Sequence, residues 1–166
     1  VQRISEIKEV IDLCWDCDLS EENVHNITGT LKLFLRELYE PVLPFDVFDD
    51  IIHILDGSDP ENLPPDILNS LLRVLSALPQ DNKRLLLRVL RLGALVDSHS
   101  SENKMPCANV ATVLGPNLAR RPQGAGVGTE GDPGQALADA PLVNRLCYGM
   151  LSHMEGTQQA LSGEGG

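Results

Sequence analysis

The sequence has no long apolar run, no excess of positive charge and few cysteines. No apolar stretch approaches the roughly 20 residues that a membrane-spanning helix needs, and charged residues interrupt the N-terminal segment, unlike a signal peptide. The chain carries 13 Lys and Arg against 24 Asp and Glu, a formal net charge of −11. Nucleic-acid phosphates require a basic surface. We therefore expect a soluble globular protein that has no transmembrane segment and binds no nucleic acid.

Four cysteines, at positions 14, 17, 107 and 147, are too sparse for a secreted disulfide scaffold. We therefore expect a reducing, cytoplasmic location, with membranes reached through other domains. Cys14 and Cys17 form a CxxC, which suggests a redox pair or half of a zinc site. A zinc site needs four ligands, and no second CxxC or paired histidine motif follows. A thioredoxin-type site needs a strand-and-helix pattern, which is missing. We predict no metal and no cofactor.

Apolar residues recur at helical spacing almost throughout, and no alternating strand pattern competes. The pattern predicts helices at about 4–16, 23–38, 45–55, 65–78, 81–97, 106–114 and 141–154. Gly115-Pro116 should end the sixth of them. The predicted fold class is all-α, a single helical bundle domain over 1–154. We expect a flexible Gly-rich loop at 123–134 and, because apolar content is low, a disordered tail at 155–166.

The helix expected at 23–38 has a polar strip on which His25, Gly29, Lys32 and Arg36 fall together. Two cations four residues apart repel slightly, and a glycine inside a helix costs roughly 1 kcal/mol relative to alanine. A smooth spot beside two cations would let another surface approach closely. The alternative, which spacing alone favours, is a solvated face with a tight helix contact at Gly29.

The stretch at 103–120 places asparagines around a helix start. Asn103 and Asn109 flank the start, and Asn117 follows among apolar residues. Asparagine is a poor helix former that often serves caps and turns. Spacing alone therefore favours capping and loop anchoring for Asn103 and Asn117.

Three stretches, in their order and separation, resemble the Rho GTPase-activating (RhoGAP) domain family. They are VHNITGTLKLFLRELYEPVLPF (24–45), LPQDNKRLLLRVL (78–90) and NKMPCANVATVLGPNLAR (103–120). The resemblance covers about residues 1–120. It implies a helical domain that binds a Rho-family small GTPase of the Rho, Rac or Cdc42 type in its GTP-bound state. It also implies stimulation of GTP hydrolysis, with no substrate turnover by the domain itself.

The resemblance also implies which residues bind the GTPase. Lys32 and Arg36 stand at the lysine and arginine of the family's LK-x₃-R motif, and Asn109 at the asparagine of its N-[LV]-A motif. Supporting positions are expected at Gly29, Asn103 and Asn117.

One element of the family pattern is missing from the sequence. The family's catalytic arginine lies in a G-x-x-R-x-S-G type loop directly before the helix that begins here near Val1, and no such loop is present. Arg3 is the nearest arginine, but it falls within the expected helix. We therefore expect no catalytic residue in this sequence, and little or no acceleration of hydrolysis. The chain is then a fragment or a natural variant, and the alternatives are a non-catalytic GTPase-binding adaptor and a helical scaffold without GTPase contact.

Overall fold

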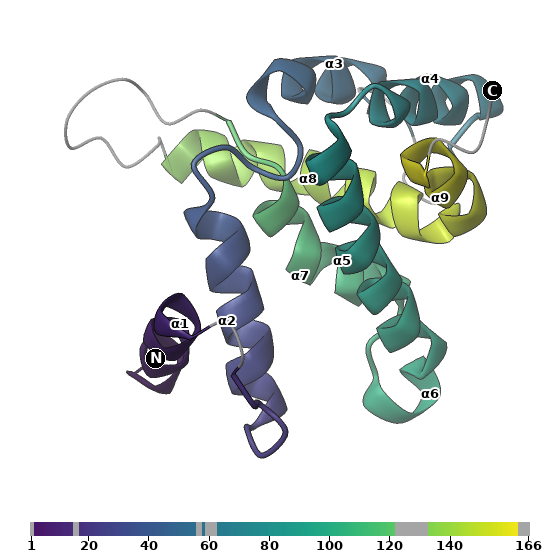
Figure 1. Ribbon diagram of the computed structural model, residues 1–166. Helices are drawn as coiled ribbons and strands as arrows, with labels where there is room; N and C mark the ends of the chain where they lie inside the picture. The colour runs from purple at the N-terminus through teal and green to yellow at the C-terminus, as the bar shows by residue number, and fades with distance from the viewer. Residues whose placement is uncertain (1, 15–16, 56–57, 59–62, 122–132, 163–166) are drawn as a thin grey trace. The chain divides into compact units, whose positions relative to one another are not determined.

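The computed structural model describes residues 2–14, 17–55, 58, 63–121 and 133–162. All regular structure in these segments is helical (Figure 1), which confirms the predicted all-α class. The helices form two compact units, Val1–Tyr39 and Glu40–Gly166. None of the described helices combines the length and the apolar content needed to cross a membrane.

The first unit contains two helices that pack on each other, α1 (Gln2–Leu13) and α2 (Val24–Glu37). α2 begins after Asn23, whose side chain accepts a hydrogen bond from the backbone N–H of His25 at 2.8 Å. An asparagine in this position satisfies one of the N–H groups that the first turn of a helix leaves unpaired. α2 therefore starts within one residue of its predicted start.

The second unit is built from longer-range packing between helices. Its described residues form α3 (Phe45–Leu55), α4 (Pro65–Ser76), α5 (Gln80–Ser98), α6 (Ser100–Asn103), α7 (Cys107–Leu118), α8 (Pro133–Ser152) and α9 (Met154–Ser162). α7 packs most extensively on α8 and also contacts α5, while α9 packs on α4 and α5. The α3 boundaries match the predicted ones, whereas the short helix α6 was not expected.

Small residues allow the close approach of α7 to its neighbours. A Cβ atom added to Gly115 would lie 2.8 Å from the backbone oxygen of Val143 on α8. A Cβ added to Gly93 on α5 would lie 3.1 Å from the Leu114 side chain. Around these contacts, Leu90 and Met150 are fully buried. The core of the second unit therefore lies where α5, α7 and α8 meet.

α7 does not end at Gly115-Pro116, as the sequence predicted, but continues to Leu118. A proline within a helix has no N–H and leaves the carbonyl four residues earlier without its usual donor. Here that carbonyl belongs to Thr112, an exposed residue. The backbone N–H of Ala119 donates to the oxygen of Gly115 at 3.3 Å and closes the last turn.

The C-terminal region is more ordered than the sequence suggested. Residues 154–162 form α9 instead of a disordered tail, because Thr157 and Leu161 are buried against neighbouring helices. α8 begins at Pro133, earlier than expected, and continues through Pro141. Most of the Gly-rich loop expected at 123–134 falls outside the described residues. The extent of a single domain over 1–154 stays a prediction.

Candidate functional site

Gly29 lies where α2 meets α1. A Cβ atom at this position would overlap Cδ1 of Ile4 and lie 3.2 Å from its Cγ1. The smooth spot on α2 is therefore occupied by a side chain of α1, which is the tight helix contact considered from the sequence. A supporting role for Gly29 toward a partner would act through the packing of α1 on α2.

Arg3 lies within α1, as the sequence predicted, and pairs with carboxylates of its own unit. It hydrogen-bonds to Glu22, which precedes α2, and to Glu6 at 3.1 Å. The hydrogen bond to Glu22, followed by that to Glu6, raises the pKa of Arg3 above its ordinary value. The same bond to Arg3 holds the pKa of Glu22 below its usual range. Arg3 thus links α1 to the start of α2.

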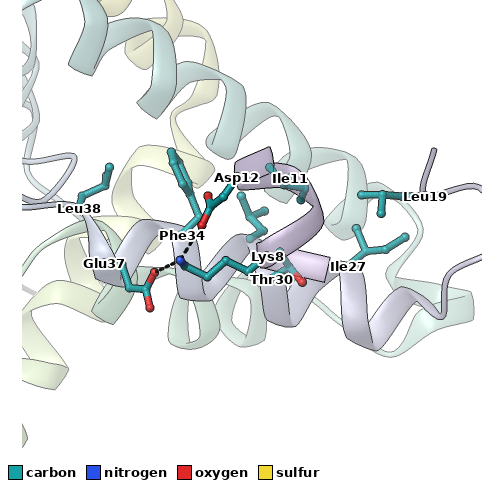
Figure 2. A pocket seen from close by; sticks show the side chains of 10 residues that line it. Lys8, Ile11, Asp12, Leu19, Ile27, Thr30, Phe34, Glu37 and Leu38 are labelled. Carbon is teal, nitrogen blue, oxygen red and sulfur yellow. Dashed lines mark hydrogen bonds and ion pairs between the residues drawn. The ribbon is translucent and has the colours of Figure 1, made fainter. Parts of the chain in front are cut away.

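Lys8 is the second paired cation of this unit, at the mouth of a groove between α1 and α2. Its Nζ lies 2.9 Å from an oxygen of Asp12 and 3.5 Å from an oxygen of Glu37. Figure 2 draws both interactions as dashed lines. The hydrogen bond to Asp12, with its charge and that of Glu37, raises the pKa of Lys8. The groove has a volume of about 430 Å³ and a mainly apolar wall. Its apolar lining residues are Ile11, Leu19, Ile27, Leu31, Phe34 and Leu38.

Lys32 and Arg36 differ from Arg3 and Lys8, because neither has an acidic partner within the described part of the chain. Lys32 is half-buried and Arg36 is exposed, one helical turn further along α2. Arg36 also lies in the last turn, where the helix dipole favours a cation. In a chain of net charge −11, these two positive charges remain available to an external anion.

In the second unit, Asn103 anchors the connection from α5 to α7. Its Nδ2 donates to the oxygen of Val96 at 2.7 Å, and its Oδ1 accepts from the N–H of Met105 at 2.8 Å. The loop-anchoring role that the sequence predicted for Asn103 is therefore confirmed. Both bonds have the ordinary length of an N–H···O contact.

Asn109 is exposed in the first turn of α7. Its backbone N–H donates to Pro106 at 2.8 Å, and its side-chain Nδ2 lies 3.4 Å from the oxygen of Lys104. Pro106 is the N-cap residue of α7, and its side chain forms no capping hydrogen bond. The carboxamide of Asn109 is thus on the surface beside the α6–α7 connection.

Asn117 lies near the opposite end of α7 and is buried. Its Nδ2 donates to the oxygen of Val113 at 2.7 Å, one turn back. The oxygen of the next residue, Leu118, accepts from Leu43 at 2.9 Å. Any supporting role of Asn117 would therefore act through the conformation of α7.

The candidate residues divide between the two units. Lys32 and Arg36 are together on α2, while Asn103 and Asn109 are joined through the α6–α7 connection. The meeting of all three binding residues at one surface stays a prediction.

The cysteines do not form a metal centre within the described residues. Cys14 is exposed and Cys17 is half-buried. Burial raises the pKa of the Cys147 thiol to about 12, so it stays protonated at neutral pH. Burial also raises the pKa of Cys107, whose Sγ lies 3.7 Å from Oγ of Ser152.

The comparison with known families agrees with the helical fold. A family model described as RhoGAP domain matches residues 1–123. The chain belongs to the RhoGAP domain family. The match includes α2 with Lys32 and Arg36, and α7 with Asn109.

Curated relatives of this RhoGAP domain are long proteins of which it spans a small part. Rho GTPase-activating protein gacY of Dictyostelium discoideum is 35% identical over 153 residues, 92% of this chain but 20% of that protein. Rho GTPase-activating protein 1 of Homo sapiens is 32% identical over 118 residues, 70% of this chain and 26% of that one. The chain thus spans about a fifth to a quarter of the length of these relatives.

Two solved structures share the fold. The BH domain from GRAF, the GTPase regulator associated with focal adhesion kinase, superimposes with a TM-score of 0.76 at 21% identity, covering 95% of this chain and 79% of that one. Human Rho GTPase activating protein 15 gives a TM-score of 0.77 at 21% identity, covering 94% and 70% respectively. At this identity the likeness establishes the RhoGAP-type helical architecture.

Sequence reasoning missed the backbone conformation of Lys104, which has φ 59° and ψ 28°. Among the described non-glycine residues it has the one positive φ. Asparagine or glycine is more usual in this conformation. Because a lysine stands there, no local sequence signal indicates the left-handed turn before α7.

Proposed function

We propose that this chain is the GTPase-binding domain of a Rho GTPase-activating protein. It would bind Rho-family small GTPases of the Rho, Rac or Cdc42 type in their GTP-bound state through Lys32, Arg36 and Asn109. The observation that carries the proposal is that Lys32 and Arg36, on α2, have no acidic partner among the described residues, in a stretch that the RhoGAP domain model matches. The domain regulates a GTPase and turns over no substrate of its own.

The chemistry of the proposed contact follows from the residue types. A lysine offers a compact point charge, whereas an arginine offers a planar fork that matches a carboxylate. Asn109 adds a neutral amide that can both donate and accept. Acidic and amide groups on a GTPase surface are therefore suitable partners. Charge complementarity of this kind increases the association rate and falls with ionic strength.

Stimulation of hydrolysis needs a further group. Phosphoryl transfer builds negative charge on the transferring oxygens, and an arginine inserted from an activating protein raises the rate by roughly 10³–10⁵. The complete activator would supply such an arginine. Arg3 is a poor candidate, since its guanidinium pairs with Glu22 and Glu6. We therefore propose that residues 1–166 alone bind the GTPase but accelerate hydrolysis little. The second candidate function is accordingly an adaptor that binds a Rho-family GTPase without activating it.

The first experiment measures capture of Rho, Rac and Cdc42 types loaded with a non-hydrolysable GTP analogue. Lys32→Ala combined with Arg36→Ala should weaken capture at least about 30-fold, the lower end for truncating charges of a desolvated contact. Capture of the GDP-loaded forms should be weaker than that of the GTP forms. Capture that the double variant retains in full would refute the assigned surface.

The matched control combines Arg84→Ala with Arg88→Ala, two exposed cations at the same spacing on α5. It removes the same net charge and should leave capture nearly unchanged. Single-turnover hydrolysis on the same samples then separates an activator, which shortens the lifetime of bound GTP, from an adaptor, which does not.

A further inference from the structure

The side chain of Asn103 holds the connection that leads into α7. It joins the last part of α5, through the oxygen of Val96, to the N–H of Met105. Its two polar atoms are thus both engaged within the chain, at 2.7 and 2.8 Å. These contacts cross the connection, so they fix its path relative to α5.

Lys104 lies between Asn103 and Met105. Its backbone has a left-handed conformation, which residues with a side chain rarely adopt. Its backbone N–H donates to the oxygen of Ser100 at 3.0 Å. The bond from Met105 to Asn103 spans Lys104, because it links the residues on either side of it. A strained conformation persists where its surroundings determine it. Asn103 therefore helps to set the direction of the Lys104 carbonyl.

The Lys104 carbonyl faces the side chain of Asn109. The Asn109 Nδ2 lies 3.4 Å from that oxygen, a long contact that orients the amide without holding it tightly. With its Nδ2 on Lys104, the carboxamide has an Oδ1 that no donor occupies among the described residues. A short chain of hydrogen bonds thus connects Asn103, through the backbone of Lys104, to the side chain of Asn109.

We propose that Asn103 is a positioning residue for Asn109, acting through the backbone of Lys104. The proposal rests on the proposed function in one respect, that Asn109 contacts the GTPase. Asn103 itself needs no contact with the partner, since each of its polar atoms already has a partner in the chain. Its effect on binding should accordingly depend on the presence of the Asn109 side chain.

A double-mutant cycle tests this dependence by measuring the dissociation constant for a GTP-loaded Rho-family GTPase. Asn103→Ala should weaken binding about fivefold when Asn109 is present, and less than about twofold in the Asn109→Ala background, because coupled residues are non-additive. Equal effects of Asn103→Ala in both backgrounds would overturn the proposal. Asn103→Asp, which keeps the acceptor for Met105, should recover part of the loss.

Asn82→Ala provides a matched control in the same unit. The Asn82 Nδ2 donates to the oxygen of Val42 at 2.9 Å, so this variant also removes a side-chain-to-backbone bond, one that is half-buried where those of Asn103 are exposed. Its effect on binding should be the same with and without Asn109. Coupling of Asn82 to Asn109 as strong as that of Asn103 would show general destabilisation and overturn the positioning role.

A second measurement keeps the inference separate from GTPase binding. Side-chain amide resonances of the free chain should show a shifted Asn109 signal in Asn103→Ala and an unshifted one in Asn82→Ala. If Asn109→Ala leaves capture unchanged, the proposed role of Asn109 in GTPase binding is refuted. The amide spectrum alone then tests whether Asn103 orients the Asn109 side chain. An Asn109 resonance that is unaffected by Asn103→Ala would then overturn it.

Discussion

Arg121 shows how much one side chain can organise in the second unit. Its guanidinium donates to both oxygens of Asp139 on α8, at 2.7 and 3.2 Å, and to Asp49 on α3 at 2.9 Å. It also lies 5.2 Å from the ring centre of Phe48, within the range of a cation–π contact. The hydrogen bond to Asp139 raises the pKa of Arg121, so it is charged throughout the physiological range.

Removal of this side chain should destabilise the fold because Asp139 is buried. Arg121→Ala takes away a bidentate partner, and we expect a loss of about 1–3 kcal/mol in the free energy of unfolding. Arg121→Lys should recover part of the loss, since lysine keeps the charge without the fork. Urea unfolding followed by circular dichroism measures both changes.

Arg84→Ala is the reference for that measurement. Arg84 and Asp81 lie 3.5 Å apart with both side chains largely exposed, and such pairs contribute roughly 0–1 kcal/mol. Equal losses for Arg84→Ala and Arg121→Ala would contradict a structural role of the Arg121 cluster.

At the scale of whole helices, α9 depends on the surfaces that α4 and α5 provide. Leu161 is 2% exposed, and Thr157 donates from its Oγ1 to Met150 at 3.1 Å. We expect Leu161→Ala to lower the free energy of unfolding by about 2 kcal/mol, the lower end for a buried leucine, because a terminal helix can detach locally. Hydrogen exchange of α9 amides would locate the effect.

Gln159→Ala, an exposed change in the same helix, should alter stability by less than about 0.5 kcal/mol. A Leu161→Ala variant as stable as the Gln159→Ala variant would agree with a disordered tail instead of a packed α9.

The helices show which parts of this fold could be read from sequence. Periodicity predicted α2 and α3 well, because a continuous apolar stripe on one helix is a local pattern. The end of α7 was predicted wrongly, since Gly115 serves a backbone contact with Val143 on α8. α9 was missed because it has few apolar side chains. They stabilise the helix only when they pack on other helices, such as α4 and α5. Tertiary contacts of this kind have no local signal.

In the candidate site, too, local features could be predicted from the sequence and tertiary contacts could not. Lys32 and Arg36 could be assigned from spacing and resemblance, since both depend on one helix and its motif. The bond from Asn103 to Val96 and the left-handed Lys104 could not, because they depend on how the chain leaves α5. The explanation of Gly29 likewise required Ile4, a residue of another helix.

At the scale of the molecule, the two units differ in the core that each can form. The described residues of the first unit bury Ile7, Thr30 and Leu35, whereas most of the core belongs to the second. A segment of about 40 residues rarely folds alone without disulfides, a bound metal or oligomerisation. Stability should therefore reside mainly in residues 40–166.

We expect residues 40–166, produced alone, to keep a helical spectrum and a cooperative unfolding transition, whereas residues 1–39 alone should be largely unstructured. Circular dichroism against temperature measures both fragments beside the whole chain. Loss of cooperative unfolding in 40–166 would mean that α1 and α2 are needed for the fold, as in the single domain predicted over 1–154. Retention, with residues 1–39 unstructured alone, would mean that Lys32 and Arg36 belong to the less stable of the two units. GTPase binding could then be lost by unfolding α2 without disturbing Asn109.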